Sequence, residues 1–378
     1  MKQGWEIKEL GLVCANLDSQ RKPITKSNRV GGDIPYYGAT GIVDYVKDYI
    51  FNEKLVLLGE DGAKWNRGDE CAFIIDGKTW VNNHAHVLRP NRKILLDEWL
   101  VYFLNSQDLT PFISGMTVPK LNQGKMNEIV IPIPPLSEQR RIVSILDEAF
   151  SSIAMAKDNA EQNLKNAKEL FESYLQSVFA NKGEEWVEKT LNEICEVKDG
   201  THDSPRYIKE GIPFVTQKNI RHDGLSFDDT RFITQADHDK FYKRSNVAFG
   251  DILISMIGAN RGMAAIVDDK RVFSIKNVGL IKENKMINKN FLLYYLKSSF
   301  AMKYVKYMSN GGAQEFVGLT VLRAFPIPYP SLEEQQTIVF KLDELSAKTI
   351  RLEAIYQQKL NGLEELKRSV LQKAFNGE

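Results

Sequence analysis

The chain contains two copies of the same sequence plan, and this duplication constrains the fold more than any other feature. Residues 136–180 align with residues 332–376 without a gap and share 16 of 45 positions. Earlier in the chain, Trp5 and Cys14 are matched 181 residues later by Trp186 and Cys195. Internal repetition on this scale predicts two similar globular domains, each followed by the same additional element.

The gap-free part of the repeat predicts one long helix in each copy. Apolar residues recur at alternating steps of four and three, from Ile142 through Leu170 to Tyr174 in the first copy. The second copy repeats this pattern from Ile338 to Val370, including Leu352 and Leu366. This spacing is typical of a coiled coil.

Proline-rich segments at 132–135 and 326–330 mark where these helices begin. Forty-odd residues at about 1.5 Å each give a rod of about 65 Å, and its narrow apolar stripe needs a partner helix. Since a globular domain separates the two helices, antiparallel pairing is the simplest arrangement. The alternative is that each stripe packs against its own globular domain.

The segments between the helices have the pattern of mixed α/β domains. Short β-type runs occur at 54–58, 251–255 and 264–267, and short helical stretches occur near 97–105 and 289–307. The predicted fold class is therefore α+β, with two globular domains, an antiparallel coiled coil and an approximate internal two-fold repeat. The predicted boundaries are 1–135 and 184–330 for the globular domains, and 136–183 and 331–378 for the helices.

Composition narrows the class of protein further. With 43% hydrophobic and 26% charged residues, the chain is of ordinary globular type and not disordered. Fifty basic and 49 acidic residues give a net charge of +1, which by itself does not indicate nucleic-acid binding. Three scattered cysteines fit a reducing compartment, and no apolar run is long enough for a membrane span. We therefore expect a cytoplasmic protein.

Signatures of catalysis are missing from the sequence. It contains no GxxxxGK phosphate loop, and the segment 258–262 is not a dinucleotide-binding loop. The tetrapeptide (Asn or Asp)-Pro-Pro-aromatic of amino-methyltransferases does not occur. His84 and His86 could supply two metal ligands, but further ligands at suitable spacing are lacking, so structural contacts are favoured and no metal site is predicted.

Several motifs resemble those of a known family. Pro-Leu-Ser-Glu-Gln-Arg-Arg-Ile-Val at 135–143 recurs in similar form at 330–339, each time at the start of a predicted helix. The segments 32–41, 199–205 and 211–219 are similar to target-recognition segments of the same family. Together they resemble the specificity subunits of type I restriction–modification systems. The first domain lacks the Gly-Thr-His-x-x-Pro stretch of the second, so the two domains are expected to read different DNA sequences.

The resemblance implies a DNA-binding subunit that is not itself an enzyme. Each globular domain would read one half of a bipartite, asymmetric site on double-stranded DNA, and the helices would set the gap between the halves. Two modification (methyltransferase) subunits would dock on the helices, and restriction (translocase/nuclease) subunits would join that complex. S-adenosylmethionine, ATP and Mg would be bound by these partners and not by this chain.

Loop residues able to contact base edges or phosphates are the candidate DNA-binding residues. In the first domain these are Tyr36, Tyr37, Thr40, Lys64, Trp65, Asn66, Arg67, Asn82, Asn83 and His84, with Lys120, Asn122 and Gln123 as weaker candidates. In the second domain they are Thr201, His202, Ser204, Arg206, Thr216, Gln217, Lys218, Asn219, Asn260 and Arg261. Gly41, Gly62 and Gly200 are expected to serve backbone geometry. Candidate partner-docking residues at the helix starts are Glu138, Gln139, Glu334 and Gln335.

Two other functions remain open at the level of sequence. One is a coiled-coil scaffold with two protein-binding globular domains, and the other is a catalytic methyltransferase whose motifs are not found. The charge is spread evenly: residues 1–135 carry 16 basic and 16 acidic groups, and residues 184–330 carry 21 and 18. If the chain binds DNA, we expect it to do so weakly without partners that supply phosphate contacts.

Overall fold

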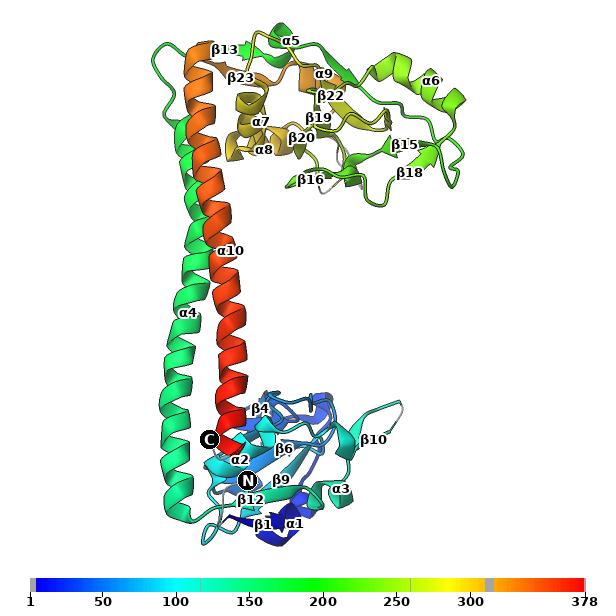
Figure 1. The fold of residues 1–378 in the computed structure, drawn as a ribbon. Coiled ribbons are helices and arrows are strands. Elements are labelled where there is room, and N and C mark those ends of the chain that lie inside the picture. Colours follow the sequence, from blue (N-terminus) through cyan, green and yellow to red (C-terminus); the bar gives the residue numbers. More distant parts are fainter. Residues whose placement is uncertain (1–4, 116, 259, 310–315, 377–378) are drawn as a thin grey trace. The chain divides into compact units, whose positions relative to one another are not determined.

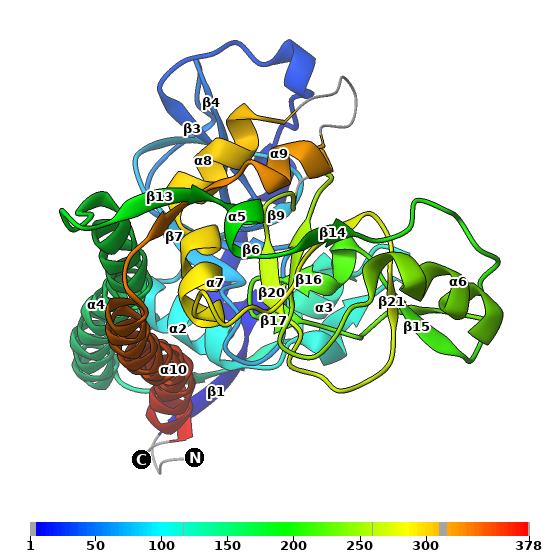
Figure 2. The same ribbon diagram turned by 90° about the horizontal axis from the view of Figure 1, so that it is seen from above.

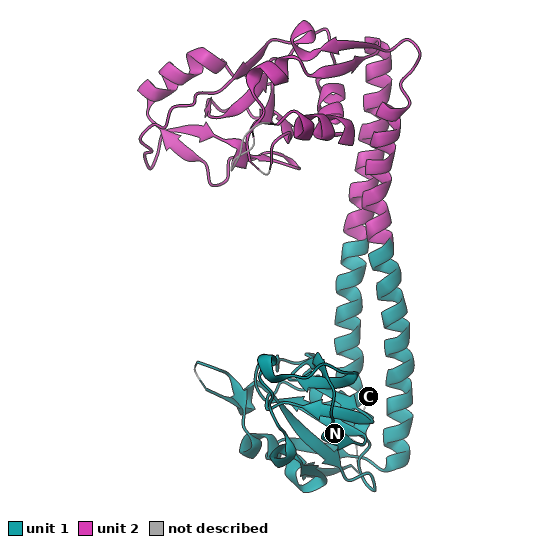
Figure 3. Ribbon diagram, turned by 180° about the vertical axis from the view of Figure 1, so that it is seen from behind, with its two compact units in different colours: residues 1–162, 356–378 teal, residues 163–355 magenta. Residues whose placement is uncertain are grey.

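The computed structural model describes residues 5–115, 117–258, 260–309 and 316–376. The chain divides into two compact units, shown in Figure 3, which comprise residues 1–162 with 356–378 and residues 163–355. Each unit holds one globular domain together with one end of each long helix. Within the described residues, no helix is long and apolar enough to cross a membrane.

Short strands around a few helices make up the globular domain of unit 1 (Figure 1). Its strands are β1 (Glu6–Glu9), β2 (Cys14–Asn16), β3 (Ile34–Gly38), β4 (Gly41–Val46), β5 (Phe51–Asn52), β6 (Leu55–Gly59), β7 (Ala72–Ile75), β8 (Lys78–Val81), β9 (Ala85–Pro90), β10 (Ile113–Ser114), β11 (Lys120–Leu121) and β12 (Val130–Ile133). Its helices are α1 (Leu10–Val13), α2 (Asp97–Ser106) and α3 (Gln123–Asn127), with 3-10 turns at Asp18–Gln20, Lys26–Asn28 and Thr110–Phe112.

Two four-stranded sheets form the framework of this domain. The first has the strand order β2-β9-β6-β7, and the second has the order β4-β3-β8-β5. β1 and β12 form a separate antiparallel pair that brings the two ends of the domain together. β6 reads Leu-Val-Leu-Leu and is buried on both faces, as expected for a central strand that packs on both sides.

The globular domain of unit 2 is built from a corresponding set of elements. Its strands are β13 (Val187–Thr190), β14 (Val197–Asp199), β15 (Ile212–Val215), β16 (Ile220–Arg221), β17 (Gly224–Leu225), β18 (Arg231–Ile233), β19 (Ile252–Ser255), β20 (Ala264–Ile266), β21 (Ser274–Ile275), β22 (Val278–Ile281) and β23 (Pro326–Tyr329). Its helices are α5 (Leu191–Ile194), α6 (Gln235–Ser245), α7 (Lys289–Lys297), α8 (Ser299–Tyr307) and α9 (Leu319–Arg323), with a 3-10 turn at Gln217–Asn219.

In the described residues the two domains share a strand framework, although the second sheet has four strands in unit 1 and three in unit 2. The sheet β14-β22-β19-β20 repeats β2-β9-β6-β7, and the pair β13-β23 repeats β1-β12. β15 lies between an antiparallel neighbour, β18, and a parallel neighbour, β21, just as β3 lies between β4 and β8. The predicted duplication of mixed α/β domains is therefore confirmed. Helix α6 lies beside β21 at the outer edge of its domain (Figure 2), and among the described residues of unit 1 no helix lies at the corresponding place between β4 and β6.

The predicted long helices are α4 (Leu136–Ala180) and α10 (Leu332–Asn376), each of 45 residues. They run antiparallel, because Phe150 of α4 packs under the Lys367 ammonium while Lys157, further along α4, pairs with Glu364 at 2.7 Å. In unit 2 the C-terminal end of α4 packs with the N-terminal end of α10 in one hydrophobic core, which also requires antiparallel helices. The predicted coiled coil is thus confirmed.

The apolar stripe of the helices differs from its predicted course at three positions. Leu170, Leu352 and Leu366 are 50%, 36% and 48% exposed. Near Leu170 the buried face passes instead through Phe171 and Leu175. The four-three spacing drifts around a real helix because 3.6 residues per turn do not match a strict heptad.

Both ends of each helix are anchored in a globular core. Phe375 of α10 packs edge-on against Trp99 and Phe103 of unit 1, with ring centroids 4.7 and 5.4 Å apart. Its repeat equivalent, Phe179 of α4, packs in the same way against Phe291 in unit 2. The identities that the two helices share at their ends therefore reflect two equivalent joints between helix and domain.

Candidate nucleic-acid interface

Loop 200–211 connects β14 to β15 in unit 2 and carries four of the predicted DNA-binding residues: Thr201, His202, Ser204 and Arg206. The side chains of the last three are exposed, whereas Thr201 is buried and its hydroxyl accepts a hydrogen bond from the Asp203 amide. A Cβ atom on Gly200 would lie 2.3 Å from the Ile275 carbonyl oxygen. The loop backbone therefore lies close against β21, and the expected need for glycine at position 200 is confirmed.

A second predicted segment, 216–219, forms a 3-10 turn whose residues divide between interior and surface. Asn219 is buried, and its amide group bonds to the Thr216 and Ser226 backbones and to the Thr230 hydroxyl. Lys218 is exposed, and Thr216 and Gln217 are half-buried. Asn219 therefore serves the fold, and Lys218 is the side chain of this turn most available to a ligand.

The turn near residue 260 likewise has one exposed residue and one that is engaged in the fold. Asn260 is exposed, while the Arg261 guanidinium donates to the Ser309 hydroxyl at 2.8 Å and to the Gly258 carbonyl at 3.1 Å. Arg261 is half-buried and is engaged in holding this turn to the chain that follows α8.

Three predicted residues of unit 1 lie inside the domain. Tyr36 is 1% exposed, and its hydroxyl accepts from the Ile24 amide at 3.0 Å. Trp65 donates to the Gly59 carbonyl at 3.2 Å, and the Asn82 amide oxygen caps the turn by accepting from the His84 amide. Because these side chains are buried and internally bonded, the structure gives them structural positions and not the surface positions expected of DNA contacts.

The remaining predicted residues of unit 1 lie at or near the surface. Thr40, Lys64, Asn66, Arg67, Asn83 and His84 are exposed, and Tyr37 is half-buried against Phe73. The His84 imidazole bonds to the Asp61 carboxylate. Of the weaker candidates, Asn122 and Gln123 are exposed, while Lys120 pairs with Glu60 at 2.7 Å. Gly41 and Gly62 have φ values of +132° and +72°, as expected of glycines needed for backbone geometry.

The helix starts hold the four predicted docking residues, and two of them are fully buried. The Gln139 side chain accepts from the Leu96 amide at 2.9 Å and donates to the Ile94 and Pro134 carbonyls. Gln335 accepts from the Asn288 amide at 2.7 Å and donates to the Pro330 carbonyl. Gln139 and Gln335, predicted as docking residues, therefore each fasten a helix to its own domain and offer no exposed side chain to a partner.

The two glutamates of this motif are half-buried. Glu138 forms a bidentate pair with Arg141, and Glu334 accepts a hydrogen bond from the Trp186 indole at 2.7 Å. Glu334 therefore also contributes to the joint between α10 and its domain.

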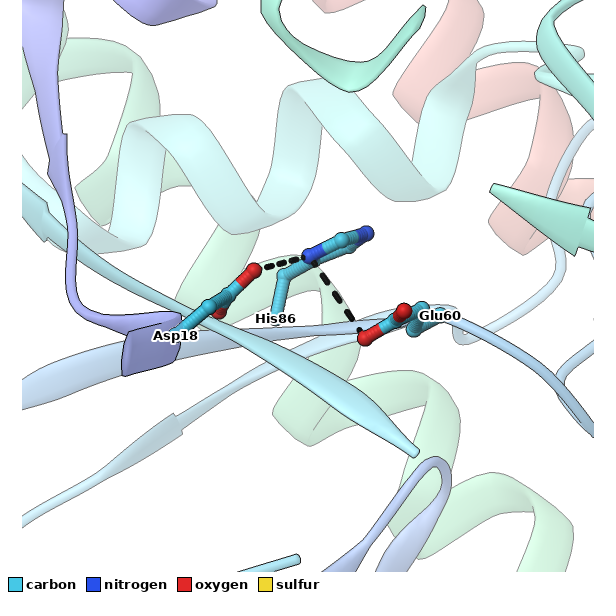
Figure 4. Close-up of side chains that lie close together, drawn as sticks. All are labelled: Asp18, Glu60 and His86. Carbon is cyan, nitrogen blue, oxygen red and sulfur yellow. Dashed lines mark hydrogen bonds and ion pairs between the residues drawn. The ribbon is translucent and has the colours of Figure 1, made fainter. Parts of the chain in front are cut away.

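Asp18, Glu60 and His86 form a compact cluster in unit 1, shown in Figure 4, with geometry that could suit a metal ion. Their polar atoms already have protein partners. The His86 Nδ1 atom lies 2.6 Å from Asp18, its Nε2 atom lies 2.7 Å from the Leu121 carbonyl, and Glu60 pairs with Arg21 and Lys120. Two cations pair with Glu60 and both imidazole nitrogens face acceptors, so these side chains form an ionic network within the domain.

Hydrogen bonds and ion pairs lower the pKa values of the two carboxylates in this network. Burial alone raises the pKa of Asp18, but hydrogen bonds from His86, Asn16 and the Val87 amide outweigh it, so the pKa is lowered. The pKa of Glu60 is likewise lowered, because Lys120 and Arg21 outweigh the effect of burial. Both carboxylates are therefore ionised at neutral pH.

Neither this network nor the contacts of Asp199 in unit 2 were predicted from the sequence. The Asp199 carboxylate accepts from the Nε and a terminal nitrogen of Arg244, at 2.9 and 2.8 Å. The 181-residue offset that relates Trp5 to Trp186 also relates Asp18 to Asp199, and this signal was available in the sequence.

Comparison with known proteins identifies the family. The sequence model of the type I restriction modification DNA specificity domain matches residues 2–166 and 183–365. The chain belongs to this family. The two matched regions correspond to the two copies of the sequence plan, so the chain carries two specificity domains.

Relatives in this family differ in how much of the chain they match. A type I restriction enzyme specificity subunit of Haemophilus influenzae is 42% identical over 142 residues, which are 38% of this chain and 36% of that protein. The MjaVIII specificity subunit of Methanocaldococcus jannaschii is 23% identical over 405 aligned positions, covering 99% of this chain and 93% of that protein. In a solved structure of a type I restriction–modification system, one chain has a TM-score of 0.75 at 20% identity, covering 99% of this chain and 98% of that one, which shows a shared fold.

Proposed function

We propose that the chain is the non-catalytic DNA sequence-specificity subunit of a type I restriction–modification complex. Each specificity domain reads one half of a bipartite, asymmetric DNA site. The helix pair sets the gap between the halves and docks two methyltransferase subunits, which restriction subunits join. The methyl donor, ATP and Mg are bound by those partners.

The observation that carries this proposal is a repeated framework with loops that are not repeated. The strand orders of the two domains correspond. The connections between equivalent strands differ, since loop 17–33 precedes β3 while the shorter loop 200–211 precedes β15. The connection from β18 to β19 contains α6, whereas the described chain from β4 to β6 contains no helix. Two copies of one scaffold with different surface loops are suited to reading two different sequences, because base readout depends on loop side chains.

The helices support the proposed role as a spacer. Each is a continuous segment of 45 residues, and its ends are fastened to globular cores by buried aromatic and glutamine side chains. Such an element keeps a fixed length better than a flexible linker of the same number of residues.

The test is modification mapping. The chain is co-expressed with the methyltransferase subunit of its own system in a host without other methylation, and the methylated positions of the host genome are mapped. One bipartite motif that disappears when this chain is omitted is expected. Methylation without this chain, or none with it although the complex assembles, contradicts the proposal. A scaffold that only binds proteins would leave the genome unmodified.

A further inference from the structure

Asp18 and Asp199 occupy the same place in the two domains. Asp199 ends β14 and pairs with Gly279 of β22, while Asp18 follows β2 by two residues and receives a hydrogen bond from the Val87 amide of β9. The next connections are equivalent as well, since loop 17–33 leads to β3 and loop 200–211 leads to β15, the middle strands of corresponding sheets. Each aspartate therefore stands at the root of an equivalent loop.

Both carboxylates are buried and bonded to one arginine and one histidine. The Asp18 side chain is 9% exposed and contacts His86 at 2.6 Å and Arg21 at 3.4 Å. The Asp199 side chain is 8% exposed and contacts Arg244 at 2.8 Å and His202 at 3.1 Å. A carboxylate that is largely shielded from water and held by several hydrogen-bond donors restrains its segment, because leaving these donors would expose it to an unfavourable environment without partners.

In unit 2 this bonding fixes the segment that carries the exposed polar side chains. His202 bonds to Asp199 on one side and to the Asn277 side chain on the other, at 2.7 Å. Lys276 donates to the Ser204 hydroxyl at 2.6 Å, so the exposed residues His202 and Ser204 are both tied to the β21–β22 region.

Loop 17–33 is fixed in a comparable way but presents a more basic surface. The Trp80 indole donates to the Lys22 carbonyl at 2.6 Å, and the Tyr36 hydroxyl accepts from the Ile24 amide at 3.0 Å. The loop contains four basic and two acidic residues, in a domain that carries 16 of each in total. The exposed side chains that follow Arg21 include Lys22, Lys26, Ser27 and Asn28.

From this equivalence we infer that loop 17–33 is a DNA-reading loop of the first domain, and that Asp18 and Asp199 are positioning residues that hold the two equivalent loops in their reading conformation. Lys26, Ser27 and Asn28 are of the types that contact phosphates and base edges. Tyr36, predicted from the sequence to contact DNA, is instead buried, and its hydroxyl accepts a hydrogen bond from the backbone of this loop. The inference rests on the proposed function.

The experiment maps genomic methylation by the complete complex with substituted chains. The double variant Lys26→Ala/Asn28→Ala changes exposed side chains only, and we expect the methylation rate at the cognate site to fall about tenfold or more, with one half of the motif relaxed. Asp18→Asn is expected to relax that same half, and Asp199→Asn the other half. The exposed Lys93→Ala in the same domain is the matched control and should leave motif and rate unchanged.

For each variant, the half of the motif that the unsubstituted domain reads serves as the internal reference. A positioning role relaxes one half while the other half and the gap are retained, whereas simple unfolding would abolish methylation at every site. An unchanged motif and rate for the double variant overturn the role of loop 17–33, and unchanged motifs for both aspartate variants overturn the positioning role. If the unsubstituted complex methylates no bipartite motif, the proposed function itself fails.

Discussion

Gln335 illustrates how a single buried side chain joins an element to its domain. Its side chain is completely buried, accepts a hydrogen bond from the Asn288 backbone N–H and donates one to the Pro330 carbonyl. Replacement by alanine leaves both backbone groups without their partner, at a cost of about 1–3 kcal/mol each. For a unit of this size we expect Gln335→Ala to lower the thermal unfolding midpoint by about 5–10 °C.

Calorimetry of the full chain measures this effect, and Gln336→Ala is the matched control. Gln336 is the next residue of the same helical turn and is exposed, so its replacement should change stability by less than about 0.5 kcal/mol. Equal midpoints for Gln335→Ala and Gln336→Ala would show that the buried amide does not hold the joint.

The ionic network of unit 1 makes a prediction about acid. The folded-state pKa values of Asp18 and Glu60 are lowered, so their stabilising contribution is present above the unfolded-state values and is lost as the pH falls through the folded ones. Arg21, Lys120 and His86 face these carboxylates from neighbouring elements. We expect Asp18→Asn to be less stable than the parent chain near neutral pH, and the difference to shrink below about pH 4.

Thermal unfolding at a series of pH values between about 7 and 3 tests this linkage. Asp44→Asn is a useful comparison, because the pKa of that exposed carboxylate is also lowered, by Arg29, and exposed pairs contribute little. A difference between parent and Asp18→Asn that stays constant down to the lowest pH would rule out the carboxylate as its source.

For single residues, the sequence indicated which side chains have the chemistry to contact DNA, but not which of them are exposed. Tyr36, Trp65, Asn82 and Asn219 have the chemistry of DNA contacts, yet each satisfies a buried backbone group. Polar and amphipathic residues serve turns and base edges through the same hydrogen-bonding groups. Only the three-dimensional course of the chain separates the two uses.

At the scale of elements, the long helices were predictable because their signal is redundant. Two aligned copies, proline-rich starts and a sustained apolar stripe all indicated the same 45-residue segments. The exposed positions of Leu170, Leu352 and Leu366 were not predictable from spacing alone, since a straight helix drifts out of a strict heptad by about 20° per repeat. The offset of 181 residues relates Asp18 to Asp199 in the sequence, and the strand order shows that the loops after them lead to equivalent strands.

A matched deletion in both helices tests whether they set the gap between half-sites. Removing residues 154–160 from α4 together with residues 357–363 from α10 takes out two turns from each partner and keeps the heptad phase of the antiparallel pair. Each helix shortens by about 10 Å. We expect the gap in the methylated motif to shrink by about three base pairs at 3.4 Å each, with both halves retained.

Deletion of residues 154–160 from α4 alone is the comparison variant. It leaves α4 seven residues shorter than α10 although the ends of both helices are fastened to globular cores, so we expect it to lower stability sharply. An unchanged gap in a stably folded double deletion would show that the helices are not the ruler.

For the whole molecule, the net charge of +1 conceals small differences between segments. The globular domain of unit 2 carries 21 basic and 18 acidic residues, and that of unit 1 carries 16 of each, with a local excess of basic groups in loop 17–33. Surfaces with so little net charge attract the phosphate backbone only weakly, so their polar side chains serve base recognition more than overall affinity. This accords with a subunit that acts within a larger complex.

The division of labour between the two domains is the central claim, and an exchange of one domain tests it most directly. Residues 184–330 are replaced by the corresponding segment of a family member with a different target, and genomic methylation by the resulting complex is mapped. The account predicts that one half of the motif changes to that of the donor, while the other half and the gap stay the same. A motif changed in both halves, or in neither although methylation persists, would contradict it.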